Sequence, residues 1–261
     1  MRTLYTVLTV LAISLLIQAC GGGSGSASGG GTTGTGKGGS MARFAIRGEN
    51  LYTVNRDAMR IFDISEPSHP YPVAKVQVPF DVETLFAYKS YLYVGGESGV
   101  YIYDANISTQ PTEIGKFTHI KSCDPVVVHD DLAFVTLNNG STCRLNSGAN
   151  TLEILDIKNP TEPKLLKTIP MWSPKGLGVD ANGTLFVCDG NAGLKVFGVT
   201  KYDHNDTNET RVSLEPLQKP LLDVDCYDLI PWQKTLYVSN HQDIRIIDYT
   251  HIPLVELSKI K

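Results

Sequence analysis

The sequence has few basic residues, and they form no cluster. It contains 23 Lys and Arg residues against 27 Asp and Glu residues, for a formal net charge of −4 at pH 7. Residues 1–19 hold one charged side chain, Arg2, so a chain without them keeps 22 basic and 27 acidic side chains. Nucleic acid and anionic lipid are bound through basic patches, so we expect neither to be recognised by this protein.

The motifs of common catalytic and metal sites are missing too. The sequence contains no GxSxG, no HExxH, no phosphate-binding loop and no closely spaced cysteine pair of the zinc-binding kind. Its six histidines lie apart, none two or four residues from another, at positions 69, 119, 129, 204, 241 and 251. The sequence therefore predicts no catalytic residue of these kinds, no cofactor and no resident metal.

The sequence also lacks the periodicity of an amphipathic helix. No window sustains apolar residues at the i, i+3, i+4 and i+7 spacing of an amphipathic helix. Apolar residues instead alternate with period two in short segments rich in Val, Ile, Tyr and Phe, which is typical of β-strands. The sequence therefore predicts an all-β protein.

One such segment, Met59–Asp63, recurs four times. The copies are Val100–Asp104, Leu152–Asp156, Leu194–Gly198 and Ile244–Asp248. Each follows a strand with an aromatic residue near its centre, and these aromatics are Tyr52, Tyr93, Phe134, Phe186 and Tyr237. An aspartate at the end of a strand can accept a hydrogen bond from the amide two residues later and set a turn. We therefore expect the recurring aspartates to be structural.

The spacing of the copies predicts the fold. Successive copies lie 41, 52, 42 and 50 residues apart, and strand repeats with periods of about 40 to 50 residues build propellers. Residues 41–261 divide into five repeats, so we expect one domain, a five-bladed β-propeller with four antiparallel strands in each blade. Leu137–Asn150 and Lys201–Ser213 lengthen two repeats, and we expect both to be surface loops, with a binding role as the alternative.

Residues 1–19 have the features of a signal peptide. Arg2 precedes an apolar run, Leu4–Ile17, that is shorter than the ~20 residues of a membrane-spanning helix. The ending Ile17-Gln18-Ala19-Cys20 resembles the lipobox of bacterial lipoproteins, which implies cleavage before Cys20 and acylation of that cysteine. An ordinary secretory signal with an incidental cysteine is the alternative.

Residues 20–40 are almost wholly Gly, Ser and Thr after Cys20. Such a segment cannot bury enough apolar surface to fold, and it acts as a flexible tether spanning roughly 25 Å. The lipobox implies a bacterial cell envelope, with acyl chains holding the protein to a membrane. Gly21 replaces the aspartate associated with inner-membrane retention in similar lipoproteins, so we expect the outer membrane.

Four cysteines remain in the predicted propeller: Cys123, Cys143, Cys188 and Cys226. An even number in an exported chain predicts disulfides. The strand assignment places all four at one end of the blades and favours Cys123–Cys143 with Cys188–Cys226 among three possible pairings. A four-cysteine zinc site is the alternative.

Acidic residues near the starts of the innermost strands, with two tryptophans, form a candidate binding face. Its members are Asp81, Glu83, Asp124, Trp172, Asp225, Asp228 and Trp232. We expect this face to bind a protein or glycan without catalysis. A carbohydrate-active hydrolase is the alternative, because two carboxyl groups at a defined separation can cleave a glycosidic bond.

The repeats also resemble a known family. Arg60–Pro67 and Leu152–Pro160 are similar to the LVIVD repeat of bacterial surface and secreted proteins. The resemblance extends over Met41–Lys261 and is weakest in the fourth repeat, where Gly198 replaces the aspartate. The family implies a β-propeller outside the cytoplasm and no established activity. We therefore expect a membrane-tethered binding or scaffold module.

Overall fold

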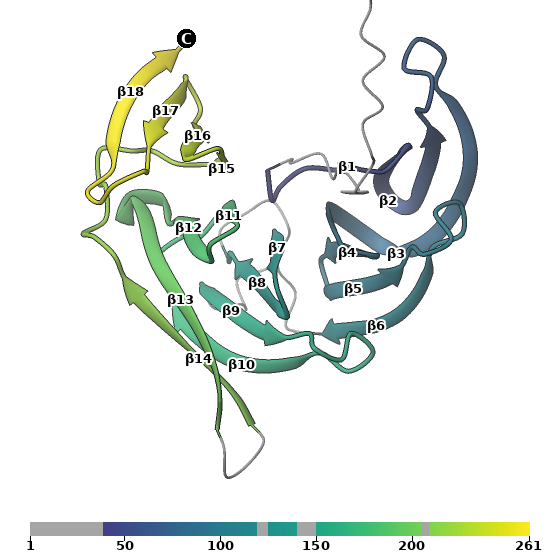
Figure 1. Ribbon diagram of the computed structural model, residues 1–261, viewed down its shortest axis with the longest axis horizontal. Coiled ribbons are helices and arrows are strands. Elements are labelled where there is room, and N and C mark those ends of the chain that lie inside the picture. Colours follow the sequence, from purple (N-terminus) through teal and green to yellow (C-terminus); the bar gives the residue numbers. More distant parts are fainter. Residues whose placement is uncertain (1–38, 119–124, 140–149, 205–208) are drawn as a thin grey trace, which may run out of the picture. The chain divides into compact units, whose positions relative to one another are not determined.

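The computed structural model describes residues 39–118, 125–139, 150–204 and 209–261, which are coloured in Figure 1. Contacts divide the chain into residues 1–32 and 33–261, and every described residue belongs to the second part. Within the described ranges the chain forms strands and one 3₁₀ turn, η1 (Gly190–Ala192). No helix in these ranges is long and apolar enough to cross a membrane.

The strands form four antiparallel sheets. The first sheet contains, in order, β1 (Phe44–Arg47), β2 (Asn50–Asp63), β3 (Tyr71–Tyr88), β4 (Tyr91–Gly96), β5 (Gly99–Asp104) and β6 (Thr112–Thr118). The second contains β7 (Val126–His129), β8 (Leu132–Leu137), β9 (Thr151–Asp156) and β10 (Lys164–Pro170). The third contains β11 (Leu177–Val179), β12 (Thr184–Cys188), β13 (Leu194–His204) and β14 (Glu209–Pro216). The fourth contains β15 (Asp228–Trp232), β16 (Thr235–Ser239), β17 (Ile244–Asp248) and β18 (Val255–Ile260).

The third, fourth and fifth sequence repeats each form one four-stranded sheet. In each of these sheets the strands pair antiparallel with their neighbours in the chain. This agrees with the predicted blades, and the all-β class and the β-propeller architecture are confirmed.

The first two repeats share a sheet instead. β3 pairs with β2 through residues 71–82 and with β4 through residues 82–88, so one strand serves both repeats. β2 also joins two segments that the sequence predicts as separate strands. No glycine lies between Val54 and Met59 to close a tight turn, whereas the second repeat has Gly99 with a φ of +146° at that place. The count of five blades therefore stays a prediction.

The recurring aspartates end the third strands as predicted. The carboxylates of Asp63, Asp104, Asp156 and Asp248 accept hydrogen bonds from the amides of Ser65, Asn106, Lys158 and Thr250, at 2.9, 2.8, 2.9 and 2.7 Å. Gly198 cannot make this bond, and β13 continues past it to His204. Lys201–Ser213 is therefore largely a paired extension of β13 and β14, and the prediction of a loop there was wrong.

The outer strands of four repeats carry a β-bulge at corresponding positions. In β3, β6, β10 and β18 the extra residue is Val73, Ile114, Leu166 and Leu257, respectively. A bulge bends and twists its strand, which makes an outer edge a poor template for pairing with another chain. The first three of these residues also pack against hydrophobic cores.

Four hydrophobic cores lie between consecutive repeats. The core between the second and third repeats, for example, joins Tyr93 and Ile102 to Val126 and Val135. The cores between the first and second, third and fourth, and fourth and fifth repeats are built in the same way. Each repeat thus has a forward face, which bears the central aromatic, and an opposite backward face. In each of the four cores, the forward face of one repeat meets the backward face of the next.

A disulfide joins the fourth and fifth repeats. Cys188 ends β12 and is bonded to Cys226, with the two Cα atoms 5.0 Å apart. Both cysteines are fully buried in the core between these repeats. This confirms one of the two predicted bonds. Cys123 and Cys143 lie outside the described residues, and their pairing stays a prediction.

Removing the disulfide should destabilise the domain without abolishing its fold. It closes a loop of 38 residues, and such a crosslink contributes about 4 kcal/mol in the chain-entropy model. We expect the double variant Cys188→Ala/Cys226→Ala to lose about that much free energy of unfolding in urea titrations. Free thiols at both positions in wild-type protein from an oxidising compartment would contradict the assignment.

Candidate functional site

A cavity lies where the first strands of the five repeats converge. Its volume is about 360 Å³, and β1, β3, β7, β11 and β15 all line it. This size is at the lower end of pockets that hold small molecules. We call it the axial cavity, and it is the candidate functional site.

The interior of the axial cavity is mainly apolar. Ala45, Leu85, Val127, Leu177 and Leu229, one from each lining strand, are all buried. β7, β11 and β15 are also edge strands of their sheets, so each has one backbone edge without a neighbouring strand in its sheet. Such edges offer N–H and C=O groups to a ligand. The cavity therefore combines apolar walls with backbone hydrogen-bonding groups.

Polar residues lie where these first strands end. Tyr88 ends β3, and its hydroxyl accepts a hydrogen bond of 2.9 Å from the amide of Asp130. His129 ends β7, with its Nε2 atom 3.4 Å from the carboxylate of Asp130. Asp180 follows β11, accepts hydrogen bonds from two turn amides and pairs with Lys234 Nζ at 3.1 Å. These groups make this end of the cavity polar, with its carboxylates already engaged.

Residues at the opposite ends of β11 and β15 are held by the start of the described chain. The Ser40 hydroxyl donates to Asp228 at 3.0 Å and accepts from the amide of Leu177 at 2.8 Å. The amide of Met41 donates to the other oxygen of Asp228 at 3.3 Å. Gly39 and Gly176 pack so closely on this carboxylate that neither position has room for a Cβ atom. Through these hydrogen bonds and close contacts, Asp228 holds residues 39–41 in place.

Burial raises the pKa of Asp228 above its ordinary value, although hydrogen bonds from Leu229, Ser40 and Met41 partly oppose this effect. A raised pKa is a property of general acids. Both oxygens of this carboxylate are nevertheless bonded within the protein, so its geometry is that of a structural group.

The other residues of the predicted binding face are dispersed. Trp232 ends β15, about 13 Å along the strand from Asp228, and is 44% exposed. Glu83 lies 3.6 Å from Arg43. Asp225 is exposed. Asp124 and the side chain of Asp81 lie outside the described part of the chain, as does the predicted lipidation residue, Cys20.

Trp172 is 66% exposed, and its backbone is fixed by a buried carboxylate. The amides of Trp172 and Ser173 donate to Asp189 at 2.9 Å each, and Lys195 Nζ lies 2.6 Å from the other oxygen of Asp189. Sequence reasoning missed both Asp189 and Ser40, because neither belongs to a motif. Over the ranges that the structure describes, no group of His, Cys, Asp and Glu side chains could hold a metal ion.

Two aspartates with opposite pKa shifts predict opposite pH dependence. The raised pKa of Asp228 means that the folded state gains stability as pH falls toward 4, and that this contribution is lost as pH rises through the folded-state pKa. Hydrogen bonds from Thr250 lower the pKa of exposed Asp248, whose contribution is present near neutrality and lost in acid.

Thermal melts of Asp228→Asn and Asp248→Asn between about pH 2.5 and pH 7 test this difference, because the contribution of Asp248 is lost only below the ordinary pKa of an aspartate. Relative to wild type, Asp228→Asn should be more destabilising at the acidic end than at pH 7, and Asp248→Asn should show the reverse. Parallel pH profiles for the two variants would refute the assigned roles.

Solved structures resemble this arrangement of sheets at low sequence identity. A functionally unknown protein from Desulfotomaculum acetoxidans is 13% identical, with a TM-score of 0.58 over 82% of this chain and 68% of its own. A protein from Lactobacillus plantarum is 16% identical, with a TM-score of 0.60 over 81% and 67%. Citrobacter koseri AztD is 12% identical, with a TM-score of 0.53 over 80% and 59%. These similarities support the fold and transfer no activity.

Sequence comparison agrees with the repeat pattern. No curated protein is significantly similar to the sequence. A family model does match, at residues 38–78 and 147–169, which contain the first and third copies of the recurring segment. The chain therefore carries the LVIVD repeat, and it folds as a β-propeller.

Proposed function

We propose that this protein is a membrane-tethered binding module of the bacterial cell envelope, whose β-propeller holds a ligand without chemical conversion. The single observation that carries the proposal is the axial cavity, about 360 Å³ in volume and lined by all five repeats. Apolar walls with a polar end are typical of ligand sites. A small ligand, or a projecting group of a protein or glycan partner, fits a cavity of this size.

A glycosidase is the weaker alternative. Such an enzyme needs two carboxyl groups free to reach one glycosidic bond. Asp228 is bonded to Ser40 and Met41, Glu83 pairs with Arg43, and Asp180 pairs with Lys234. These contacts favour binding over hydrolysis.

The tether is part of the proposal and rests on the lipobox-like segment ending at Cys20. We expect the wild-type protein to sediment with outer membranes and its amino-terminal peptide to carry acyl chains. Cys20→Ser should leave the protein soluble or unprocessed, because the acylated thiol is lost. A wild-type chain with an unmodified amino terminus and no lipid mass would remove the tether from the proposal.

Filling the axial cavity should abolish binding. Val179 lines it, is half-buried and packs against the core between the third and fourth repeats, so Val179→Trp adds bulk at the cavity wall, and a native melting temperature shows that this core tolerates it. Val255, 57% exposed on β18, gives the control Val255→Trp. With the apolar fluorophore 8-anilinonaphthalene-1-sulfonate as probe, wild type and control should bind one equivalent, and Val179→Trp should bind none.

Equal binding by all three proteins would show that the axial cavity is not the site. The same pair of variants can then be used with envelope extracts and a panel of glycans. A natural ligand of this cavity should be retained by the control and lost by Val179→Trp. Hydrolysis of any glycan in the panel by the wild-type protein would instead support the glycosidase.

A further inference from the structure

The side chains that line the axial cavity carry charge of one sign. Asp130 and Asp180 are acidic, and no lining residue is Lys or Arg. His129 is the one lining side chain that can carry a positive charge. Walls of low polarity strengthen the field of the charges beside them, so this lining disfavours an anionic ligand and favours a cationic one.

The charge of Asp180 serves the fold. One oxygen of this buried carboxylate accepts hydrogen bonds from the amides of Asn182 and Thr184, at 2.9 Å each, and the other lies 3.1 Å from Lys234 Nζ. Asp180 therefore sets the turn after β11 and is neutralised by a lysine that does not line the cavity.

Asp130 is held differently. Its residue has a φ of +51° in the turn after β7, and its amide donates to the Tyr88 hydroxyl at 2.9 Å, so the backbone is fixed. The side chain is 72% exposed, and its Oδ2 atom lies 3.4 Å from His129 Nε2. A carboxylate has several acceptor sites, so this one contact leaves room for a ligand.

The lysines near this end of the cavity are already engaged. Lys234 pairs with Asp180, and Lys89 Nζ lies 5.1 Å from the centre of the Tyr88 ring. The residue after Asp130, Asp131, pairs with Lys201 at 3.4 Å. In the described ranges, Asp130 is therefore the lining carboxylate that has no Lys or Arg partner.

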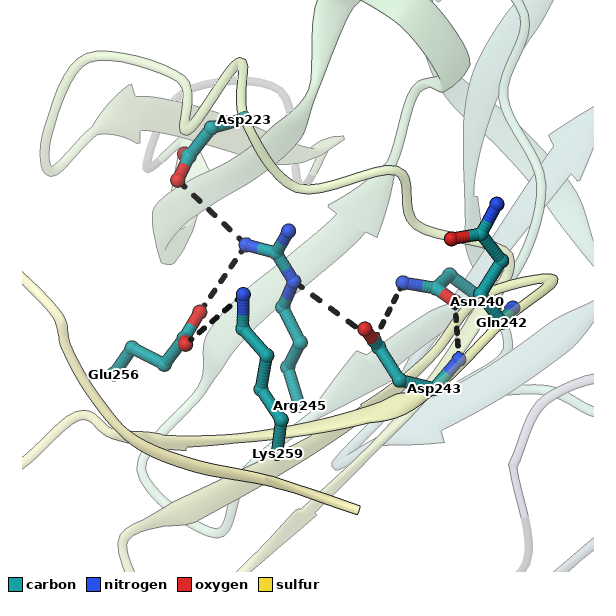
Figure 2. A network of polar contacts seen from close by, with 7 residues as sticks. All are labelled: Asp223, Asn240, Gln242, Asp243, Arg245, Glu256 and Lys259. Carbon is teal, nitrogen blue, oxygen red and sulfur yellow. Dashed lines mark hydrogen bonds and ion pairs between the residues drawn. The ribbon is translucent and has the colours of Figure 1, made fainter. Parts of the chain in front are cut away.

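A group of acidic residues on the fifth repeat shows the contrasting case, in which the protein supplies its own cations. Arg245 lies 3.6, 4.0 and 3.1 Å from the carboxylates of Asp223, Asp243 and Glu256 (Figure 2). Lys259 lies 3.5 Å from Glu256 as well. These carboxylates need no ligand, because basic side chains of the same repeat already pair with them.

We propose that the axial cavity takes an apolar molecule that ends in a protonated amino group, with the amino group beside Asp130 and the apolar part against the cavity walls. This inference rests on the proposed binding function of the cavity. Burial of the apolar part supplies most of the affinity, because an ion pair at an exposed carboxylate contributes little. Phe86 and Tyr88 also line the cavity, and aromatic faces attract ammonium groups. Asp130 therefore selects the head group of the ligand.

Three probes with one apolar body and different head groups test this selection: phenylbutylamine, phenylbutanol and phenylbutyrate. At neutral pH the first is a cation and the last an anion. In calorimetric titrations of the full chain, the amine should bind about 10-fold more tightly than the carboxylate, with the alcohol between them, because Asp130 attracts one head group and repels the other. Asp130→Asn should reduce this ratio to about 2 or less.

Asn tolerates the positive φ of this turn, so Asp130→Asn should keep a native melting temperature. Asp131→Asn is the matched control. It removes the same charge from the adjacent residue, which pairs with Lys201 and does not line the cavity, so it should keep the 10-fold ratio. The anionic dye 8-anilinonaphthalene-1-sulfonate should bind more tightly to Asp130→Asn than to the wild type.

The outcomes separate this proposal from the binding function on which it rests. Equal affinities of the amine and the carboxylate for the wild type, with dye binding abolished by Val179→Trp, would overturn the choice of head group and leave the cavity as the binding site. A ratio that Asp130→Asn leaves unchanged, with a native melting temperature, would overturn it too. Dye binding that Val179→Trp leaves unchanged would remove the cavity as the site, and this proposal with it.

Discussion

Burial of both faces of each sheet is the constraint on which this structure depends. A four-stranded sheet with apolar residues on its two faces cannot be stable in water alone, and stacking the repeats covers one face of each with the next. Four such cores join the five repeats, each made from the forward face of one and the backward face of its neighbour. The disulfide reinforces the last of these junctions.

Turn chemistry decides the length of the strands that supply these faces. An aspartate that accepts a hydrogen bond from the amide two residues on ends the third strand in four repeats. In the fourth repeat Gly198 makes no such bond, and the pairing of β13 with β14 continues to His204 and Glu209. The repeat that lacks the turn bond is thus the one whose third and fourth strands are extended.

The contacts of the acidic residues separate structural from functional roles. Asp189 is fully buried and Asp228 is half-buried, and both hold backbone segments in place through amide hydrogen bonds. The axial cavity has apolar walls, and its nearby acids are engaged in turns or ion pairs. This distribution of charge is suited to holding a ligand rather than to transferring protons.

The sequence alone determined the all-β class, the propeller architecture and the turn role of the aspartates, because these follow from local periodicity and spacing. It favoured the Cys188–Cys226 bond among three possible pairings, and the structure shows that bond. It could not predict that β3 would pair with strands of both the first and the second repeat. Nor could it predict that Ser40 would donate a hydrogen bond to Asp228, which lies 188 residues away. It also could not distinguish buried Phe186 from exposed Tyr237, which occupy equivalent positions in the repeat. Only tertiary structure decided these features, because a face is buried or exposed according to which sheet lies against it.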